Sequence, residues 1–181
     1  MSEPQSHGAD VEVRAVTKRF GEVTAAYDLL GGPAIAIDFG TATSFDCVNA
    51  GGEFVGGVIF PGILVSLEAL VGRAAKLSSV EIERPPAAIG RNTTHCLQSG
   101  MLFGYAGLVD SLVARLREEL GAEAAVVATG GLAHVIASET KTIERVEPFL
   151  TMQGLRLIFE RNREGGAPGR RTRAAREERG R

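Results

Sequence analysis

The chain has 181 residues, and its 20 basic residues nearly balance 22 acidic ones to give a formal net charge of −2. A chain of this length can bury one hydrophobic core, which favours a single domain. The N-terminus lacks an apolar signal core, and no stretch approaches the ~20 apolar residues of a membrane-spanning helix. The sequence therefore excludes a helical membrane protein and predicts a cytoplasmic one.

Three strands joined by glycine-rich turns are predicted first, at residues 34–39, 44–49 and 53–60. Asp38 lies at the end of the first strand, and Gly40 and Thr41 follow in the turn. Glycine lets backbone N–H groups approach an anion, Thr can donate its hydroxyl to a phosphate oxygen, and Asp supplies a hard oxygen ligand for a cation. The hairpin therefore has the residue types of a site for nucleotide phosphates and a cation.

Helical spacing of apolar residues follows the third strand. Pro61-Gly62 is predicted to open a helix that continues to about Ala75, because proline is tolerated at a helix start. Residues 76–90 include Pro85-Pro86 and are predicted to form an extended loop.

A long helix is predicted next, capped by Asn92, Thr93 or Thr94 and ending near Leu120. Its apolar stripe is broader than one core-facing side of a monomer requires. The stripe consists of Leu97, Met101, Leu102, Tyr105, Leu108, Val109, Leu112, Leu116 and Leu120. Gly100, Gly104 and Gly107 add a smooth face that another helix could approach. An ordinary buried helix and an interface helix both fit this pattern.

The remaining elements alternate between strand and helix. They are a buried strand at 124–128, a helix at 132–138, a short strand at 142–146 and a last helix at 150–161. Thr129-Gly130-Gly131 joins the first two, and a strand followed by a double glycine and a helix suits close approach to a nucleotide. The alternative is a plain strand-to-helix turn.

The cysteines and histidines do not form a ligand pattern. Cys47 and Cys96 lie in apolar contexts without a nearby second cysteine, so two buried, reduced thiols are predicted. His7, His95 and His134 are scattered, which argues against a metal site. His95 could line a substrate site, but a histidine on a helix surface is favoured.

The C-terminal end is rich in arginine. Residues 161–181 contain eight Arg and three Glu, and residues 163–181 offer almost nothing to bury, which predicts a disordered Arg-rich tail. The tail lacks aromatic residues between its arginines, so a solvated extension is favoured over specific binding to nucleic acid.

These segments together resemble one family, the type III pantothenate kinases. The resemblance covers residues 25–162 and rests on seven motifs. They are GGP at 31–33, DFGTATSFD at 38–46, GGVIFPGI at 56–63, IGRNT at 89–93, QSG at 98–100, ATGGLA at 128–133 and LTMQGLRLIFERN at 150–162. The resemblance implies the α/β fold of the second half of an actin-like kinase (acetate/sugar kinase type, ribonuclease H-like). That fold has a mixed sheet with three antiparallel N-terminal strands and flanking helices.

The resemblance also implies an activity and its partners. Family members use ATP to phosphorylate pantothenate to 4′-phosphopantothenate, the first step of coenzyme A biosynthesis. They use a monovalent cation, potassium or ammonium, and Mg²⁺ accompanies the nucleotide. They are cytoplasmic homodimers, which implies a homodimer through the helix at 92–120.

Residue roles follow from matching motifs. Asp38 matches the position that binds the monovalent cation, and the alternative is a strand-end Asp that caps the turn. Thr93 matches a position that binds pantothenate across the dimer. The alternative is a helix N-cap, and the two roles are compatible. Asp46 could support the site or be a solvated strand residue. The positions that match nucleotide-binding residues are Gly40, Thr41, Thr129, Gly130 and Gly131.

The first half of the family pattern does not appear in this chain. Residues 1–24 form an atypical N-terminal segment in which Arg19 matches the substrate-binding Arg. Lys18 occupies the position of the general-base Asp, and a Lys ammonium has no lone pair with which to accept a proton. No catalytic residue is therefore assigned. The alternative to a kinase is a non-catalytic remnant of the family that binds nucleotide or pantothenate or serves a regulatory role.

Overall fold

A computed structural model describes residues 21–74 and 77–165. Residues 21–30 are helical, although no helix was predicted there. The elements that follow are β1 (Ala34–Phe39), β2 (Ala42–Val48), β3 (Phe54–Pro61), α2 (Ile63–Arg73), α3 (Thr93–Leu120), β4 (Ala125–Gly130), α4 (Ala133–Ala137), β5 (Arg145–Val146) and α5 (Leu150–Gly165).

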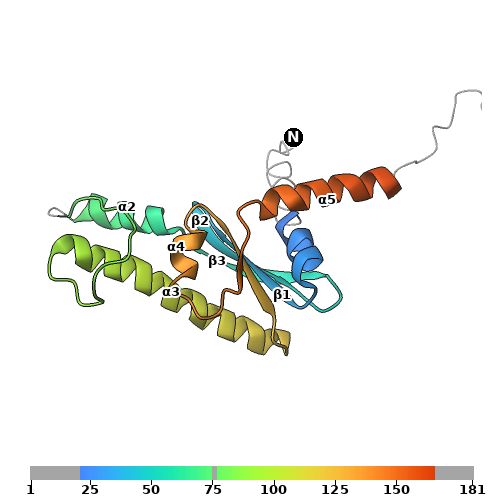
Figure 1. Ribbon diagram of the computed structural model, residues 1–181, viewed down its shortest axis with the longest axis horizontal. Coiled ribbons are helices and arrows are strands. Elements are labelled where there is room, and N and C mark those ends of the chain that lie inside the picture. Colours follow the sequence, from blue (N-terminus) through green and yellow to red (C-terminus); the bar gives the residue numbers. More distant parts are fainter. Residues whose placement is uncertain (1–20, 75–76, 166–181) are drawn as a thin grey trace, which may run out of the picture.

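The strands form one mixed sheet in the order β3-β2-β1-β4-β5 (Figure 1). β1 pairs antiparallel with β2, and β2 pairs antiparallel with β3. β4 pairs parallel with both β1 and β5. The predicted fold class is confirmed: a mixed α/β sheet with three antiparallel N-terminal strands and flanking helices.

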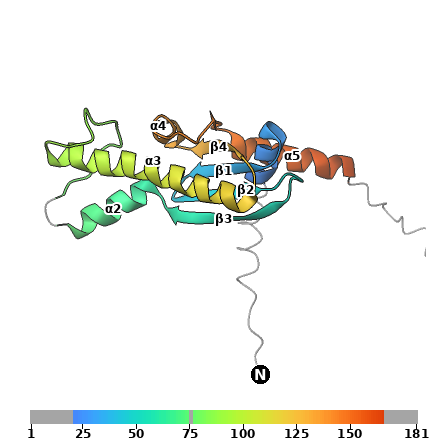
Figure 2. The same ribbon diagram turned by 90° about the horizontal axis from the view of Figure 1, so that it is seen from below.

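Side chains alternate across β1 and place a core on each face of the sheet. Ile35 and Ile37 belong to the larger core, which α2, α3 and α4 cover. Ala36 faces the other way and, with Val127 of β4, contacts the smaller core contributed by the 21–30 helix and α5. Figure 2 shows α2 and α3 lying side by side and α5 beside the 21–30 helix. The small side chains on this second face let those helices approach the sheet closely.

Local signals explain how α3 begins and ends. The Asn92 side chain accepts a hydrogen bond from the backbone N–H of His95 at 2.8 Å, which makes Asn92 the N-cap. Gly121 follows the helix with φ +65°, and its N–H donates to the carbonyls of Arg117 and Glu118. Of the three predicted caps, Asn92 is therefore the one that acts, and the N-cap alternative for Thr93 is wrong.

Several sequence-based boundaries need correction. The short strand predicted at 142–146 is only Arg145–Val146. Pro61 does not open a helix: it is the last residue of β3 and pairs with Ala42. Because β3 is an edge strand, the missing N–H of a proline is tolerated at this end. α5 continues to Gly165 rather than ending near Arg161. In the described part of the chain, no helix combines the length and apolar character that a membrane crossing requires.

Candidate functional site

The carboxyl ends of β1 and β4 bring two of the predicted site residues together. Asp38 and Thr129 are register partners on these parallel strands, and Phe39 pairs with Gly130. Side chains of paired residues project from the same face of a sheet, so the Asp38 carboxylate and the Thr129 hydroxyl share one edge. Asp38 is half-buried and Thr129 is buried. Residues 91 positions apart thus form one polar edge.

Gly130 completes this edge because it has no side chain. A Cβ built there would lie 2.5 Å from the Phe39 carbonyl oxygen and 2.8 Å from Asp38 Oδ1. Its φ of +97° is also one that residues with a side chain rarely adopt. The Gly130 backbone therefore lies directly against the Asp38 carboxylate.

The turn between β1 and β2 lies next to the same strand end. The Gly40 N–H donates to the Ala42 carbonyl at 3.0 Å, and Gly62 N–H donates to the Thr41 carbonyl at 2.9 Å. A Cβ at Gly62 would collide with the Gly40 and Thr41 carbonyl oxygens, so the start of α2 fits tightly against this turn. Gly40 and Thr41 themselves are exposed and accessible to a ligand.

Two buried carboxylates lie on the face of the sheet that also carries Asp38. Asp46 pairs with Ala36 in the register of β1 and β2, and it is buried. Glu22, also buried, accepts a hydrogen bond from Thr151 Oγ1 at 2.8 Å. The burial of Asp46 excludes the solvated alternative considered for it. Sequence reasoning missed Glu22, because nothing in residues 21–30 had suggested a helix packed on the sheet.

The predicted pantothenate-binding residues do not join this edge. Thr93 is exposed in the first turn of α3, and the N-terminal half of α3 extends beyond the sheet together with α2 (Figures 1 and 2). Arg19, and Lys18 at the expected general-base position, lie outside the described residues. The structure thus brings together Asp38, Gly40, Thr41, Thr129 and Gly130 and leaves Thr93 apart.

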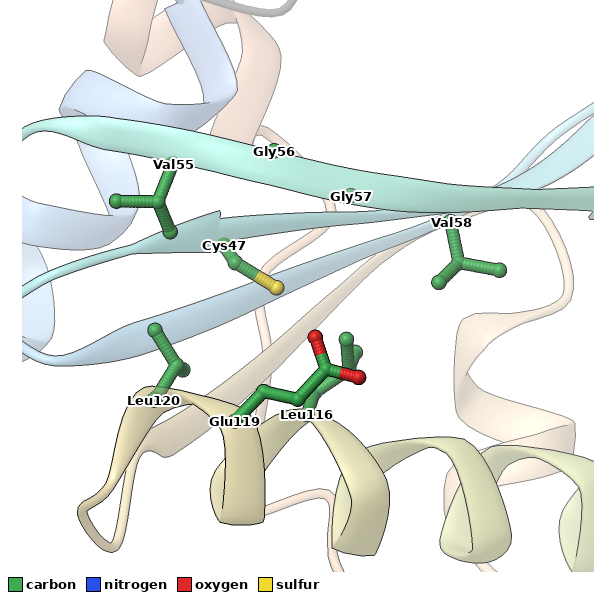
Figure 3. Close-up of a pocket in the computed structure, with 8 residues that line it drawn as sticks. All are labelled: Cys47, Val55, Gly56, Gly57, Val58, Leu116, Glu119 and Leu120. Carbon is green, nitrogen blue, oxygen red and sulfur yellow. The ribbon is translucent and has the colours of Figure 1, made fainter.

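A cavity of about 340 Å³ lies at the opposite end of the sheet, between β3 and the C-terminal part of α3 (Figure 3). It is lined by Cys47, Val55, Gly56, Gly57, Val58, Leu116, Glu119 and Leu120. Cys47 pairs with Ile35 near the start of β1, whereas Asp38 lies near its end, so the cavity is separate from the polar edge.

Cys47 and Cys96 differ in exposure. Burial, together with the nearby Asp46 and Glu119 carboxylates, raises the pKa of the Cys47 thiol from its ordinary value of 9.0 to about 11. Cys96 is exposed, so the prediction of two buried thiols is wrong for this one, although both cysteines are free. Among residues 21–74 and 77–165, no group of three or more His, Cys, Asp or Glu side chains could hold a metal ion.

Known proteins match this chain closely in sequence. A family profile described as type III pantothenate kinase matches residues 1–115, a range that includes the segment set apart above at 1–24. The chain belongs to the type III pantothenate kinase family. A type III pantothenate kinase from Roseiflexus sp. (strain RS-1) is 52% identical over 157 residues, which cover 87% of this chain and 62% of that protein. One from Moorella thermoacetica is 49% identical over 159 residues, 88% of this chain and 59% of that protein.

The matched region is shorter than these kinases. The chain spans about three-fifths of the length of the curated relatives. Among solved structures, a Baf family protein from Campylobacter jejuni superposes with a TM-score of 0.56 at 20% identity, over 80% of this chain and 65% of that one. This likeness supports the fold alone.

Proposed function

We propose that this chain is the nucleotide- and cation-binding part of a pantothenate kinase, a transferase that uses ATP to convert pantothenate to 4′-phosphopantothenate. The reaction is the first step of coenzyme A biosynthesis. Family membership supports the activity, and one structural observation supports the site: the Gly130 turn lies against the Asp38 carboxylate beside the Gly40-Thr41 turn. Glycine turns next to a carboxylate suit phosphates together with a cation.

The residues of the polar edge fit the expected ligands. Because a Cβ at Gly130 would collide with the Phe39 carbonyl and lie 2.8 Å from Asp38 Oδ1, this position admits only a bare backbone. We assign Asp38 to a monovalent cation, potassium or ammonium, and Gly40 and Thr41 to the phosphates of ATP. Thr129, Gly130 and Gly131 would approach the rest of the nucleotide. Bound ATP supplies the phosphoryl group and carries Mg²⁺, and these residues position it.

We assign pantothenate to a site completed by a second subunit. Thr93 is exposed and stands apart from the polar edge, as a residue that serves a neighbouring subunit would. Gly100, Gly104 and Gly107 leave open space on α3 where a second copy of this helix could pack. Arg19 is assigned to the same substrate. The resulting enzyme is a cytoplasmic homodimer that associates through residues 92–120.

The proposal divides the chain into three parts. Residues 25–162 form the kinase-like half-domain. It is preceded by the atypical segment 1–24, whose last residues begin the 21–30 helix, and followed by the Arg-rich tail 163–181, whose first residues complete α5. Phosphoryl transfer requires the phosphates to be held in position and a base beside the attacking hydroxyl. With Lys18 at the expected base position, this chain has no assigned catalytic residue, and the remaining two-fifths of the relatives' length is expected to supply other parts of the site.

An assay for 4′-phosphopantothenate tests the proposed activity. The purified chain is given ATP, Mg²⁺ and pantothenate, with and without potassium or ammonium. We expect cation-dependent turnover that falls at least 100-fold in Asp38→Asn. The control is Asp28→Asn, which removes the same charge from an exposed position on the 21–30 helix. Turnover that Asp38→Asn leaves unchanged would contradict the site.

Lys18 favours a second candidate function, a non-catalytic protein that binds nucleotide or pantothenate. In that case calorimetry would detect ATP binding that needs potassium and is weakened by Asp38→Asn, while the assay would show no product. The two experiments together distinguish a kinase from a binding protein.

A further inference from the structure

Tyr105 lies in the middle of α3, and its hydroxyl group reaches across to β3 and α2. The side chain is buried in the larger core. Its hydroxyl donates a hydrogen bond to the Pro61 carbonyl at 2.9 Å. A phenol has a single hydrogen to donate, so at the second contact, of 2.6 Å, the Ser66 hydroxyl donates to the Tyr105 oxygen. The phenol group is therefore used both as a donor and as an acceptor.

The Phe60 ring holds the Tyr105 ring in this orientation. The two rings meet edge to face, with centroids 5.8 Å apart and an interplanar angle of 78°. Phe60 belongs to β3, and Ser66 lies near the start of α2, the helix that lies beside α3 in Figure 2. Tyr105 thus contacts both elements that meet at Pro61-Gly62. A Phe at position 105 would fill nearly the same space, so core packing does not explain the hydroxyl.

The Pro61-Gly62 peptide connects Tyr105 to the turn between β1 and β2. The Pro61 carbonyl and the Gly62 N–H belong to the same planar peptide group. The carbonyl accepts from Tyr105, and the N–H donates to the Thr41 carbonyl at 2.9 Å. A rotation of this peptide would break both hydrogen bonds together. The bonds form a continuous chain from Ser66 through Tyr105 and the peptide to Thr41, and bonds in such a chain strengthen one another.

The Gly40-Thr41 turn depends on this support from outside. Gly40 and Thr41 are exposed, whereas Gly62 is buried. A Cβ at Gly62 would lie 2.4 Å from the Gly40 and Thr41 carbonyl oxygens, so the turn rests directly on this glycine. Because exposed residues add few packing contacts of their own, the conformation of the turn depends on the position of Gly62. That position in turn depends on the hydrogen bond from Tyr105.

We propose that Tyr105 is a positioning residue that fixes the Gly40-Thr41 turn in the conformation that receives the phosphates of ATP. Its hydroxyl does not contact the nucleotide and acts through the Pro61-Gly62 peptide. Thr93, which is assigned to pantothenate, is the first residue of the same helix, so α3 supports both parts of the site. The link to ATP rests on the proposed function, whereas the link to the turn rests on the hydrogen bonds alone.

Hydrogen exchange of single backbone amides tests the link to the turn. Exchange rates are measured by NMR in the native chain and in Tyr105→Phe, which removes the hydroxyl and keeps the ring. We expect the Gly62 amide, which donates to Thr41, to exchange about three- to tenfold faster in the variant, because one hydrogen bond of the chain is lost. The internal reference is the Gly52 amide. It donates to the Asn49 carbonyl at 3.1 Å in the turn at the other end of β3, and its rate should not change.

Two further variants make the result specific to this hydroxyl. Tyr27→Phe alters the chain's other tyrosine, whose ring packs against Gly52 at the far end of the sheet, and should leave the Gly62 rate unchanged. Ser66→Ala removes only the donor to the Tyr105 oxygen. In that variant Gly62 should exchange faster than in the native chain but more slowly than in Tyr105→Phe.

Two results would overturn the proposal. An unchanged Gly62 rate in Tyr105→Phe would mean that the turn is held without the hydroxyl. An equal increase at Gly62 and Gly52 would mean that the hydroxyl only stabilises the fold as a whole.

Calorimetry of ATP binding in potassium tests the link to the nucleotide. Tyr105→Phe should raise the Kd for ATP about three- to tenfold. Val109→Ala, which shortens a fully buried side chain one turn further along α3, should destabilise the fold but leave this Kd unchanged. Equal ATP affinity of the native chain and Tyr105→Phe would overturn the role in phosphate binding. A native chain that binds no ATP would overturn the proposed function, while the exchange rates would still decide whether Tyr105 fixes the turn.

Discussion

Gly130 lies against Asp38: a Cβ on the glycine would come within 2.8 Å of the carboxylate Oδ1. The two residues sit on neighbouring parallel strands, β4 and β1, and the contact occurs where both strands end. Backbone and carboxylate therefore meet without a side chain between them. Because of this contact, a change in the backbone at Gly130 should also displace the Asp38 carboxylate.

Replacing Gly130 by Ala should disturb that edge. The methyl group would meet the Phe39 carbonyl at 2.5 Å, and φ is +97°, so both sterics and backbone strain oppose it. We expect the free energy of unfolding in urea to fall by about 1–3 kcal/mol, the usual cost of a residue held in a disfavoured conformation. Gly131→Ala is the control, because a Cβ there has open space. Equal stability of the two variants would show that the turn adapts.

The packing of the 21–30 helix on α5 gives a second prediction. A Cβ at Gly154 would collide with the Gly21 backbone, so Gly154→Ala should push the two helices apart and cost about 1–3 kcal/mol of unfolding free energy. Gly72→Ala, in α2 with open space around it, should instead stabilise the protein by up to about 1 kcal/mol, because Ala has the higher helix propensity. Thermal and urea unfolding of both variants measure the difference. A stabilised Gly154→Ala would mean that the helices do not touch here.

Cys47 predicts a change of stability with pH. Its thiol has a pKa of about 11 in the folded protein against an ordinary value of 9.0, because the buried thiolate is disfavoured. As the pH rises, the unfolded chain therefore releases this proton before the folded protein does. The contribution of the protonated thiol to the free energy of unfolding is complete below pH 9 and is lost as the pH rises from 9 towards 11. The free energy of unfolding should fall by about 2–3 kcal/mol over this pH range.

The measurement compares urea unfolding of the native chain and Cys47→Ala between pH 8 and 11. Other groups also titrate in this range, so the informative quantity is the difference between the two pH profiles. The native chain should lose more stability than the variant above pH 9. Parallel profiles would show that Cys47 ionises as easily in the folded protein as in the unfolded one.

The sequence predicted the chemistry of the polar edge but could not determine its assembly. Residue types and motif order singled out Asp38, Gly40, Thr41 and the Thr129-Gly131 turn. The pairing of Asp38 with Thr129 depends on the register of β1 and β4, which are far apart in sequence. Register is set by packing of the whole sheet, so a local pattern does not encode it.

The missed 21–30 helix left a local signal. Val23, Ala26 and Leu30 have helical spacing, and Gly31 with φ +75° follows as a typical helix end. At Pro61 the error was the opposite, because a helix start was predicted where a strand ends. A proline suits the end of an edge strand as well as the start of a helix. Such short sequence signals fit both a helix and a strand, and packing against the neighbouring elements decides between the two.

The structure leaves only one of the two predicted features of α3, the glycine face, in support of an interface. The apolar stripe looked too broad for one core-facing side, yet Leu97, Leu102, Tyr105 and Val109 are buried in the larger core, and the other apolar residues of the stripe pack against it. An ordinary buried helix therefore accounts for the stripe. Gly100, Gly104 and Gly107 remain: all three are exposed, and a Cβ at each would meet nothing within 4 Å.

If two copies associate through α3, filling that glycine face should separate them. Gly104→Leu places a large side chain where the helices would approach, so we expect the dimer dissociation constant to rise at least tenfold in sedimentation velocity. Leu has a higher helix propensity than Gly, so the monomer should be at least as stable as before. Gly72→Leu adds the same bulk to α2 and should leave the dimer intact. A dimer that survives Gly104→Leu but dissociates with Gly72→Leu would move the interface from α3 to α2 and would detach Thr93 from its proposed role across the dimer.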